Sequence, residues 1–365
     1  MGNTYARSFE SPRAATRAET IPRVVSLKIS MAASEPACPA AEAPSAGRRG
    51  RSMQDEEMRA GRPLFEWPLI FIATLSLMAC RSTRPLQPPL SPAVFTPDGL
   101  GLVFSAAHDE KCFLFRAEIS TGVAHRFTGS ASSCEFDPAF SADGKWLAFM
   151  RAPEDGLHAA LIIADSDGRN ERVLVPDDQD NLRPVFLPDS SQILFLRSAA
   201  FEHHSSLVDN NRHKFDLFAV DRTSGQVSAL THKKFYDVNK VSISKNSEEI
   251  LLSVTTYPEG YHFLVAPTKN PATFTDSIQP TVPDSPSPPI CSDATWLPGD
   301  GRILFMAASL QPGRSDFDYN IYRLMIGTNS IQRLTQLAGV VDGFSVSADG
   351  TRAVSCRRKH RERMP

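Results

Sequence analysis

The stretch FSADGKWLAFM, residues 140–150, decides the fold because close copies of it recur along the chain. In each copy a short run of alternating apolar and polar residues leads into Asp-Gly or a related pair, and a second alternating run follows. Short polar residues and glycine accept the backbone of a tight turn, so each copy predicts two antiparallel strands. The six copies, each with its turn residue, are PAVFTPDGLGLVFSA at 92–106 (Asp98), PAFSADGKWLAFMR at 138–151 (Asp143), PVFLPDSSQILFLRS at 184–198 (Asp189), KVSISKNSEEILLSV at 240–254 (Asn246), DATWLPGDGRILFMAAS at 293–309 (Asp300) and GFSVSADGTRAVSCR at 343–357 (Asp349).

A weaker pattern follows four of these copies, in which an apolar strand, a turn with glycine and a further strand form a second hairpin. Two hairpins make one four-stranded sheet, and the turn residues of successive copies lie 45 to 57 residues apart, a spacing typical of β-propeller blades. One sheet cannot bury both of its apolar faces, so the blades must pack against each other. The second hairpins are FLFRAEISTGVAHRFT at 113–128, ALIIADSDGRNERVLV at 160–175, DLFAVDRTSGQVSALT at 216–231 and NIYRLMIGTNSIQRLT at 320–335.

This repeat, above all FSADGKWLAF followed by ALIIADSDGRNERVLV, resembles that of TolB-type β-propellers, which are relatives of the WD-type repeat proteins. The resemblance covers residues 91–357 and implies an all-β, six-bladed propeller. We expect no counterpart of the α/β domain that the TolB family places before its propeller. The proline-rich segment 267–289 after the fourth copy is predicted to be a solvated loop.

The sixth copy lacks its second hairpin, so we predict an incomplete last blade followed by a basic tail, residues 358–365. The linker 80–90 contains prolines that cannot donate hydrogen bonds to a sheet, so we do not expect it to complete the blade. Truncation or a frameshift near Ser355 is the favoured explanation, since an open sheet edge promotes aggregation.

The N-terminal part of the chain divides into three segments. Residues 1–57 are polar and show no apolar period, which predicts a disordered leader or one included by mis-annotation of the start. Residues 58–79 have the basic start and the short apolar run, Trp67 to Ala79, of a signal peptide. That run has 13 residues, fewer than the roughly 20 that a membrane-spanning helix needs.

The apolar run ends in Leu-Met-Ala-Cys, which resembles the bacterial lipobox. The resemblance implies that Met58 is the true start, that cleavage occurs before Cys80 and that Cys80 carries the lipid. Arg81 at the next position resembles the pattern for sorting to the outer membrane, with the inner membrane as the less favoured location. The alternative is a short internal apolar segment or anchor behind a genuine disordered tail.

Two further groups of residues are candidates for sites. Cys112 and Cys134 are predicted to form a disulfide, which an oxidising compartment would permit, and the alternative is a set of buried thiols. His203, His204 and His213 are weak candidates for metal ligands, and the favoured interpretation places them in a solvated loop of blade 3. No cofactor motif occurs, so no cofactor is expected. The formal net charge of −2 gives no indication of nucleic-acid binding.

No Gly-x-Ser-x-Gly elbow occurs in the sequence, which excludes the serine-peptidase class for the chain as given. We therefore predict a monomeric, non-catalytic binding scaffold, lipid-anchored on the periplasmic side of the outer membrane, whose partner is a protein or a cell-envelope glycan. The alternatives are a propeller enzyme of the polysaccharide-lyase type, a fragment of a propeller-bearing peptidase, and a decayed gene product.

Overall fold

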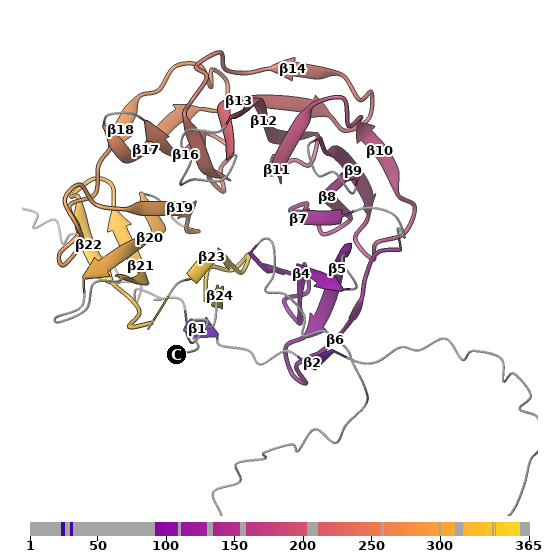
Figure 1. Cartoon of the computed structure of the whole chain (residues 1–365), viewed down its shortest axis with the longest axis horizontal. Coiled ribbons are helices and arrows are strands. Elements are labelled where there is room, and N and C mark those ends of the chain that lie inside the picture. The colour runs from indigo at the N-terminus through magenta and orange to yellow at the C-terminus, as the bar shows by residue number, and fades with distance from the viewer. Residues whose placement is uncertain are drawn as a thin grey trace, which may run out of the picture. The chain divides into compact units, whose positions relative to one another are not determined.

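The computed structural model describes most of the predicted propeller and five residues upstream of it. The described residues are 23–25, 30–31, 92–108, 111–129, 134–153, 158–202, 211–256, 259–298, 301–310, 317–337, 339 and 341–357. They contain strands and turns but no helix, so none of the described segments is a helix that could span a membrane. Six sheets stand around a central axis, as Figure 1 shows, and the fold is an all-β propeller.

Each sheet is one blade, and its first strand lies nearest the axis (Figure 1). Blade 1 has β3 (Val94–Phe95), β4 (Gly101–His108), β5 (Lys111–Glu118) and β6 (Val123–Arg126), and blade 2 has β7 (Cys134–Phe140), β8 (Trp146–Ala152), β9 (Ala160–Asp165) and β10 (Arg172–Val175). Blade 3 has β11 (Asp180–Phe186), β12 (Gln192–Glu202), β13 (Asn211–Asp221) and β14 (Val227–Ala229), and blade 4 has β15 (Asp237–Ile243), β16 (Glu249–Thr256), β17 (Gly260–Pro267) and β18 (Asp276–Ile278). Blade 5 has β19 (Cys291–Trp296), β20 (Arg302–Leu310), β21 (Phe317–Met325) and β22 (Ser330–Arg333), and blade 6 has β23 (Val341–Val346) and β24 (Arg352–Arg357).

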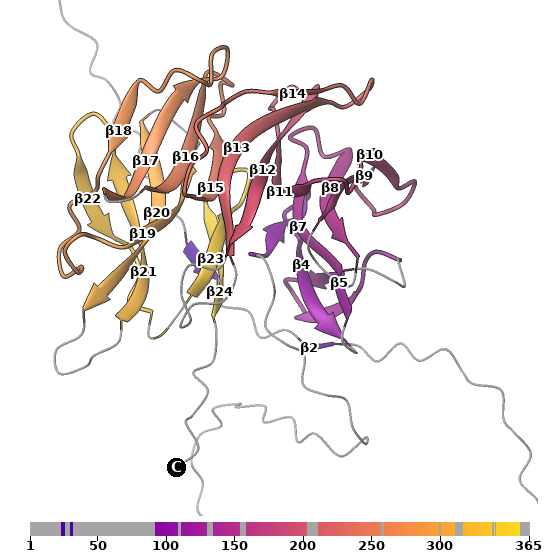
Figure 2. The same ribbon diagram turned by 45° about the horizontal axis from the view of Figure 1, so that its top comes forward.

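All ten hairpins predicted from the repeat are present, and the neighbouring blades stand side by side in Figure 2. The prediction for segment 267–289 was wrong in part, because β18 and the buried Val282 belong to blade 4. The sequence hides this hairpin, since its turn lacks the glycine that marks the others and prolines surround its second strand.

Blade 6 is incomplete, as predicted, but it has a third strand that the sequence did not predict. β1 (Arg23–Val25) pairs in parallel with β24, and β2 (Ser30–Met31) pairs in parallel with β6 of blade 1. These five residues lie in the predicted leader 1–57 and are paired rather than disordered. The rest of that leader, the predicted signal peptide 58–79, the linker 80–90 and the tail 358–365 lie outside the described residues.

The core lies between neighbouring blades, where the second strand of the repeat contributes its most buried side chain. Phe149, Phe195 and Phe305 occupy equivalent positions. Each lies three residues after the residue whose carbonyl accepts the turn-closing hydrogen bond, and each is fully buried. Phe305 contacts Phe263 of the preceding blade, with ring centroids 5.3 Å apart. Apolar contact across the blades therefore holds the ring together.

The Asp-Gly pair recurs in the turns of the repeat for a local structural reason. In blade 2 the Ser141 hydroxyl donates to the Asp143 carboxylate at 2.6 Å, and the Trp146 amide donates back to Ser141 at 2.9 Å. Gly144 follows with φ of +72°, and a Cβ there would lie 2.9 Å from Pro97 of blade 1. The Asp-Gly pair thus closes the hairpin and allows close contact between adjacent blades.

The equivalent turn of blade 6 predicts a pH-dependent contribution to stability. Hydrogen bonds from Ser347 and then Thr351 lower the pKa of Asp349 from 3.8 to about 2. The stabilisation is therefore present above pH 3.8 and is lost as the pH falls through about 2. Asp349 is exposed and screened by solvent, so we expect Asp349→Asn to lower the free energy of unfolding at pH 7 by only about 0.5–1 kcal/mol.

Denaturant titrations of wild type and Asp349→Asn between neutral and acidic pH measure this effect. The difference between the two proteins should shrink as the carboxyl group becomes protonated. A difference that stays constant down to the lowest pH at which the protein folds would contradict the assignment.

Candidate functional site

A cavity of about 390 Å³ lies on the axis of the ring. The inner strands of all six blades line it, so it is the central channel of the propeller (Figure 1). Its polar lining comes from four neighbouring inner strands, with apolar side chains opposite. The polar residues are Asp137, Arg183, Asn239, Lys240, Ser292 and Asp293.

Bulges in the inner strands bring several of these side chains into the channel. The register of β7, β11 and β19 shifts at the bulge, and Asp137, Arg183 and Asp293 have φ of +50°, +53° and +57° there. A bulge redirects a side chain locally, and a left-handed backbone costs roughly 1–2 kcal/mol for a residue other than glycine. A positive φ is less usual for Arg183 than for the two aspartates, because its long side chain lacks the local hydrogen bonding that makes this backbone tolerable for aspartate.

Hydrogen bonds of the channel residues connect different blades. The Asp137 carboxylate accepts the Arg183 backbone amide at 3.0 Å, which joins the bulges of blades 2 and 3. The Lys240 ammonium donates to the Phe344 carbonyl at 3.1 Å, so it reaches from blade 4 to blade 6. The Asp137 carboxylate and the Lys240 ammonium thus have hydrogen-bond partners within the protein before any ligand is bound.

The channel shifts the pKa values of Asp137 and Lys240 in the direction that favours their neutral forms. Burial raises the pKa of Asp137, and the nearby Arg183 opposes that shift. Burial lowers the pKa of Lys240, and Asp293 opposes it. Both side chains keep some surface accessible inside the channel. Acidic and basic groups thus lie close together in a poorly solvated space, an arrangement suited to binding polar groups of either charge.

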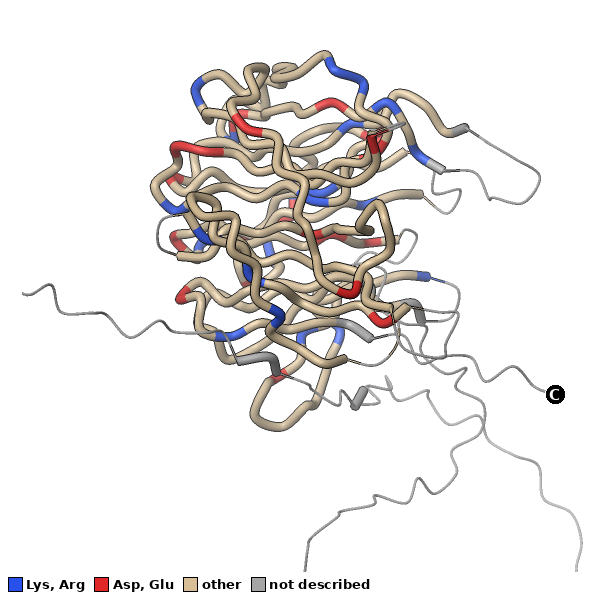
Figure 3. Tube along the Cα trace, turned by 90° about the vertical axis from the view of Figure 1, so that its left-hand side faces the viewer, with Lys and Arg blue, Asp and Glu red and all other residues tan. Residues whose placement is uncertain are grey.

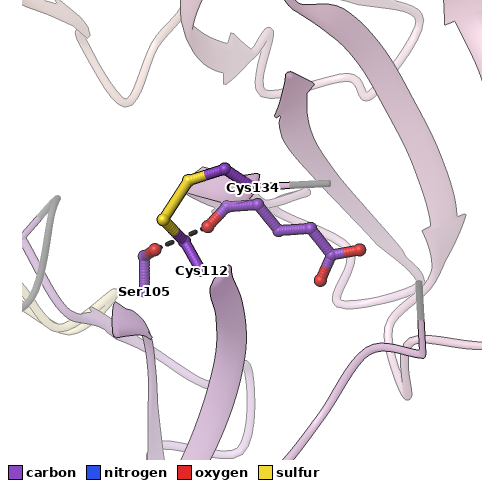
Figure 4. The surroundings of a disulfide bond; sticks show 4 residues. Ser105, Cys112 and Cys134 are labelled. Carbon is purple, nitrogen blue, oxygen red and sulfur yellow. Dashed lines mark hydrogen bonds between the residues drawn. A yellow bond between two sulfur atoms is a disulfide. The ribbon is translucent and has the colours of Figure 1, made fainter. Parts of the chain in front are cut away.

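The predicted disulfide partners are bonded to each other in the structure. Cys112 in β5 and Cys134 in β7 form a disulfide between blades 1 and 2, with Cα atoms 4.3 Å apart. Figure 4 shows the bond beside the hydrogen bond that the Ser105 hydroxyl donates to the Glu135 carbonyl at 2.5 Å. Cys291 is a buried thiol whose pKa burial raises to about 12, so it is not a reactive nucleophile. Cys80, the predicted lipid site, lies outside the described residues.

Loss of this disulfide should destabilise the propeller. Its two cysteines are 22 residues apart, and closing a loop of that size stabilises a fold by about 3 kcal/mol in the chain-entropy treatment. We expect the double variant Cys112→Ser, Cys134→Ser to lose about 2–4 kcal/mol of unfolding free energy. Chemical denaturation of wild type under oxidising and reducing conditions provides the control, because reduced wild type should match the variant. Equal stability of all three samples would contradict the prediction.

The three histidine candidates do not form a site in the described structure. His203 and His204 lie outside the described residues. His213 is buried in β13, where its ring stacks on Tyr236 at 4.4 Å and its Nδ1 lies 3.0 Å from the Tyr236 carbonyl oxygen. It does not line the channel cavity. Within the described ranges, no group of three or more histidine, cysteine and acidic residues is placed to hold a metal ion.

The channel residues were missed by the sequence analysis, although a signal was present. Asp137 and Arg183 each stand directly before a proline that opens a copy of the repeat, and Asp293 opens its own copy. A charged residue before an apolar strand is unremarkable by itself, and only the bulge shows that it faces the axis. Elsewhere on the tube of Figure 3, acidic and basic residues alternate without a large field of one sign.

No known protein family matches the chain, and no curated protein matches it in sequence. Solved structures do match in fold. TolB from Acinetobacter baumannii superposes with a TM-score of 0.50 at 15% identity, covering 75% of this chain and 58% of that protein. A TolB from Agrobacterium tumefaciens gives 0.53 at 14% identity, covering 74% of this chain and 90% of its own, and hydrazine synthase from Kuenenia stuttgartiensis gives 0.51 at 13% identity, covering 75% of each chain.

The chain thus spans 58% of the length of the Acinetobacter protein and most of the Agrobacterium protein. At such low identity the likeness concerns the fold alone. Hydrazine synthase shares that fold with the TolB proteins, so the fold by itself does not assign an activity. The chain has the β-propeller fold of the TolB proteins.

Proposed function

We propose that this protein is a lipid-anchored β-propeller of the cell envelope, facing the periplasm from the outer membrane, that binds a protein or an envelope glycan without catalysing a reaction. The observation that carries the proposal is the set of charged bulge residues, Asp137, Arg183 and Asp293, which converge on one cavity from three blades. Residues that the surrounding structure holds in a strained backbone conformation are more frequent at functional sites than elsewhere.

Two sequence features support the envelope location. The Leu-Met-Ala-Cys stretch ending at Cys80 supplies a lipidation signal, and the Cys112–Cys134 disulfide suits an oxidising compartment. Metabolic labelling with radioactive palmitate tests the anchor: wild type should be labelled and recovered with the membrane, whereas Cys80→Ser should be unlabelled. Label on both proteins, or on neither, would contradict lipidation at Cys80.

Arg183 allows binding and folding to be separated in one variant. Glycine adopts φ of +53° without the steric penalty that arginine suffers, although it also makes the unfolded chain more flexible. We therefore expect Arg183→Gly to keep the free energy of unfolding within about 1 kcal/mol of wild type. If the guanidinium serves binding, ligand binding should nevertheless be lost.

Two probes cover the proposed ligand classes. Co-sedimentation with purified peptidoglycan sacculi tests a glycan, and a photo-cross-linking residue at Asn239, inside the channel, tests an envelope protein in living cells. Binding by wild type that Arg183→Gly abolishes would support the proposal, with Arg169→Gly on an exposed turn as the matched control. A cross-link or sedimentation that is equal in all three proteins would place binding elsewhere. The non-catalytic role predicts that acidic polysaccharides incubated with the protein gain no unsaturated ends.

A further inference from the structure

The outer edge of blade 6 is occupied by residues from far upstream in the chain. β23 and β24 form an antiparallel pair, and β1 lies on the other edge of β24. The pairing is parallel, with Arg23 opposite Arg352, Val24 opposite Ala353 and Val25 opposite Val354. Blades 1 to 5 each have four strands from one continuous segment, whereas in the described part of blade 6 β1 is the third strand.

The same upstream segment also contacts the neighbouring blade. Ser30 and Met31 of β2 lie opposite Val123 and Ala124 of β6, the outermost strand of blade 1, again in parallel. Four residues separate β1 from β2. The two short strands β1 and β2 therefore pair with the sixth and the first blade, where the last described blade of the ring meets the first (Figure 1).

Contacts with blade 1 also hold β23 and β24 in place. Ala353 is fully buried, Val354 packs in the core of blade 1, and the Arg352 guanidinium lies 5.1 Å above the Phe95 ring. Ser345 of β23 donates a hydrogen bond to the Ala93 carbonyl of blade 1. Blade 6 is thus seated against blade 1 through side chains, while the other edge of β24 pairs with β1 through the backbone.

Lipidation at Cys80, part of the proposed function, has a direct consequence here. Translation from Met58 or cleavage before Cys80 would give a protein without residues 23–31, and β24 would lose the strand that pairs with its outer edge in this structure. An open, preformed edge is the surface that strand addition uses, since main-chain hydrogen bonds supply the affinity.

We propose that the outer edges of β24 and β6 form a strand-acceptor site for an extended polypeptide segment in parallel orientation. Residues 23–31 occupy the site in the full-length chain, and in the lipid-anchored form an extended segment of a partner protein takes their place. The partner contributes a β-branched, apolar strand, as Val24 and Val25 do here, and its binding completes the sixth blade.

The test uses the full-length chain with a specific protease site inserted after Gly50, so that the propeller folds before the cut. After cleavage, gel filtration shows whether the leader fragment stays with the propeller. A fluorescent peptide of residues 21–33 is then added in excess to replace it. We expect the wild-type fragment to co-elute with the propeller and the labelled peptide to exchange into the site with one-to-one stoichiometry.

Two peptide variants make the result specific. Replacing both Val24 and Val25 with proline removes the amides that a strand donates, and should weaken binding about tenfold or more. Replacing both with threonine keeps β-branched side chains and amides, and should change binding by no more than about threefold. Peptide binding should also slow hydrogen exchange at residues 352–354.

Immediate separation of the wild-type fragment, or equal binding of the proline peptide, would overturn the proposal. If cleavage unfolds the protein, hydrogen exchange of the uncut chain decides instead, since amides at residues 352–354 must exchange faster in the chain with Val24→Pro and Val25→Pro than in wild type. The Arg183→Gly variant should bind the peptide as wild type does. Failure of strand addition is therefore distinguishable from failure of the channel to bind a ligand.

Discussion

Replacing Arg151 with alanine is expected to lower the free energy of unfolding by about 3 kcal/mol or more, because it leaves a buried carboxylate without its cation. The Glu135 side chain is completely buried, and the Arg151 guanidinium donates to it at 2.7 and 3.1 Å. The other Glu135 oxygen accepts a hydrogen bond from the Thr128 hydroxyl. That single neutral donor cannot replace the charge of the guanidinium.

The next blade supplies a matched control. Arg197 lies opposite Asn181 as Arg151 lies opposite Glu135, and it donates to the neutral Asn181 side chain at 2.9 Å. Arg197→Ala therefore leaves no buried charge behind, and we expect it to cost about 1 kcal/mol. Urea denaturation of both variants measures the difference.

A second substitution separates the charge from the loss of packing. Adding Glu135→Gln to Arg151→Ala removes the uncompensated charge, so part of the lost stability should return. Equal losses for Arg151→Ala and Arg197→Ala, with no recovery in the double variant, would show that the ion pair contributes no more than an ordinary polar contact.

Much of the fold was predictable because one hairpin-forming sequence pattern recurs six times along the chain. Each Asp-Gly turn, flanked by alternating residues, encodes a hairpin through nearest neighbours alone, as the hydrogen bonds of Ser141 and Asp143 show. Hairpins of this kind need no knowledge of distant residues. Turns that depart from this sequence pattern are harder to recognise. The β17–β18 hairpin was missed because its turn lacks the usual glycine.

The channel site and the closure of the ring depend on contacts that sequence spacing does not encode. Asp137, Arg183 and Lys240 meet on the axis only because blades from different parts of the chain close into a ring. The parallel pairing of β1 with β24 joins residues more than 300 positions apart, and three residues are too few to show a strand period. The disulfide partners, by contrast, were predicted from adjacent blades and lie on adjacent blades.

Replacing Phe305 with alanine is expected to lower the free energy of unfolding by about 3–5 kcal/mol, the range for a fully buried phenylalanine. Its ring lies 5.3 Å from Phe263 of blade 4 and 5.7 Å from Tyr322 of its own blade, so the cavity would open in the interface between two blades. Blade 4 has Leu252 at the equivalent position, as the matching turn hydrogen bonds show. Phe305→Leu should accordingly lose less, about 1–1.5 kcal/mol.

The exposed Phe201, with 46% of its surface accessible, supplies the control for phenylalanine removal as such. Phe201→Ala should change stability by about 0.5 kcal/mol or less, since nearly half of the residue is already exposed to solvent. Thermal and denaturant unfolding of the three variants gives the comparison. If Phe305→Ala and Phe201→Ala cost the same, apolar packing between blades would not be what holds the ring together. The hydrogen bonds between blades, such as the one that the Ala294 amide donates to the Ser253 hydroxyl, would then have to supply that stability.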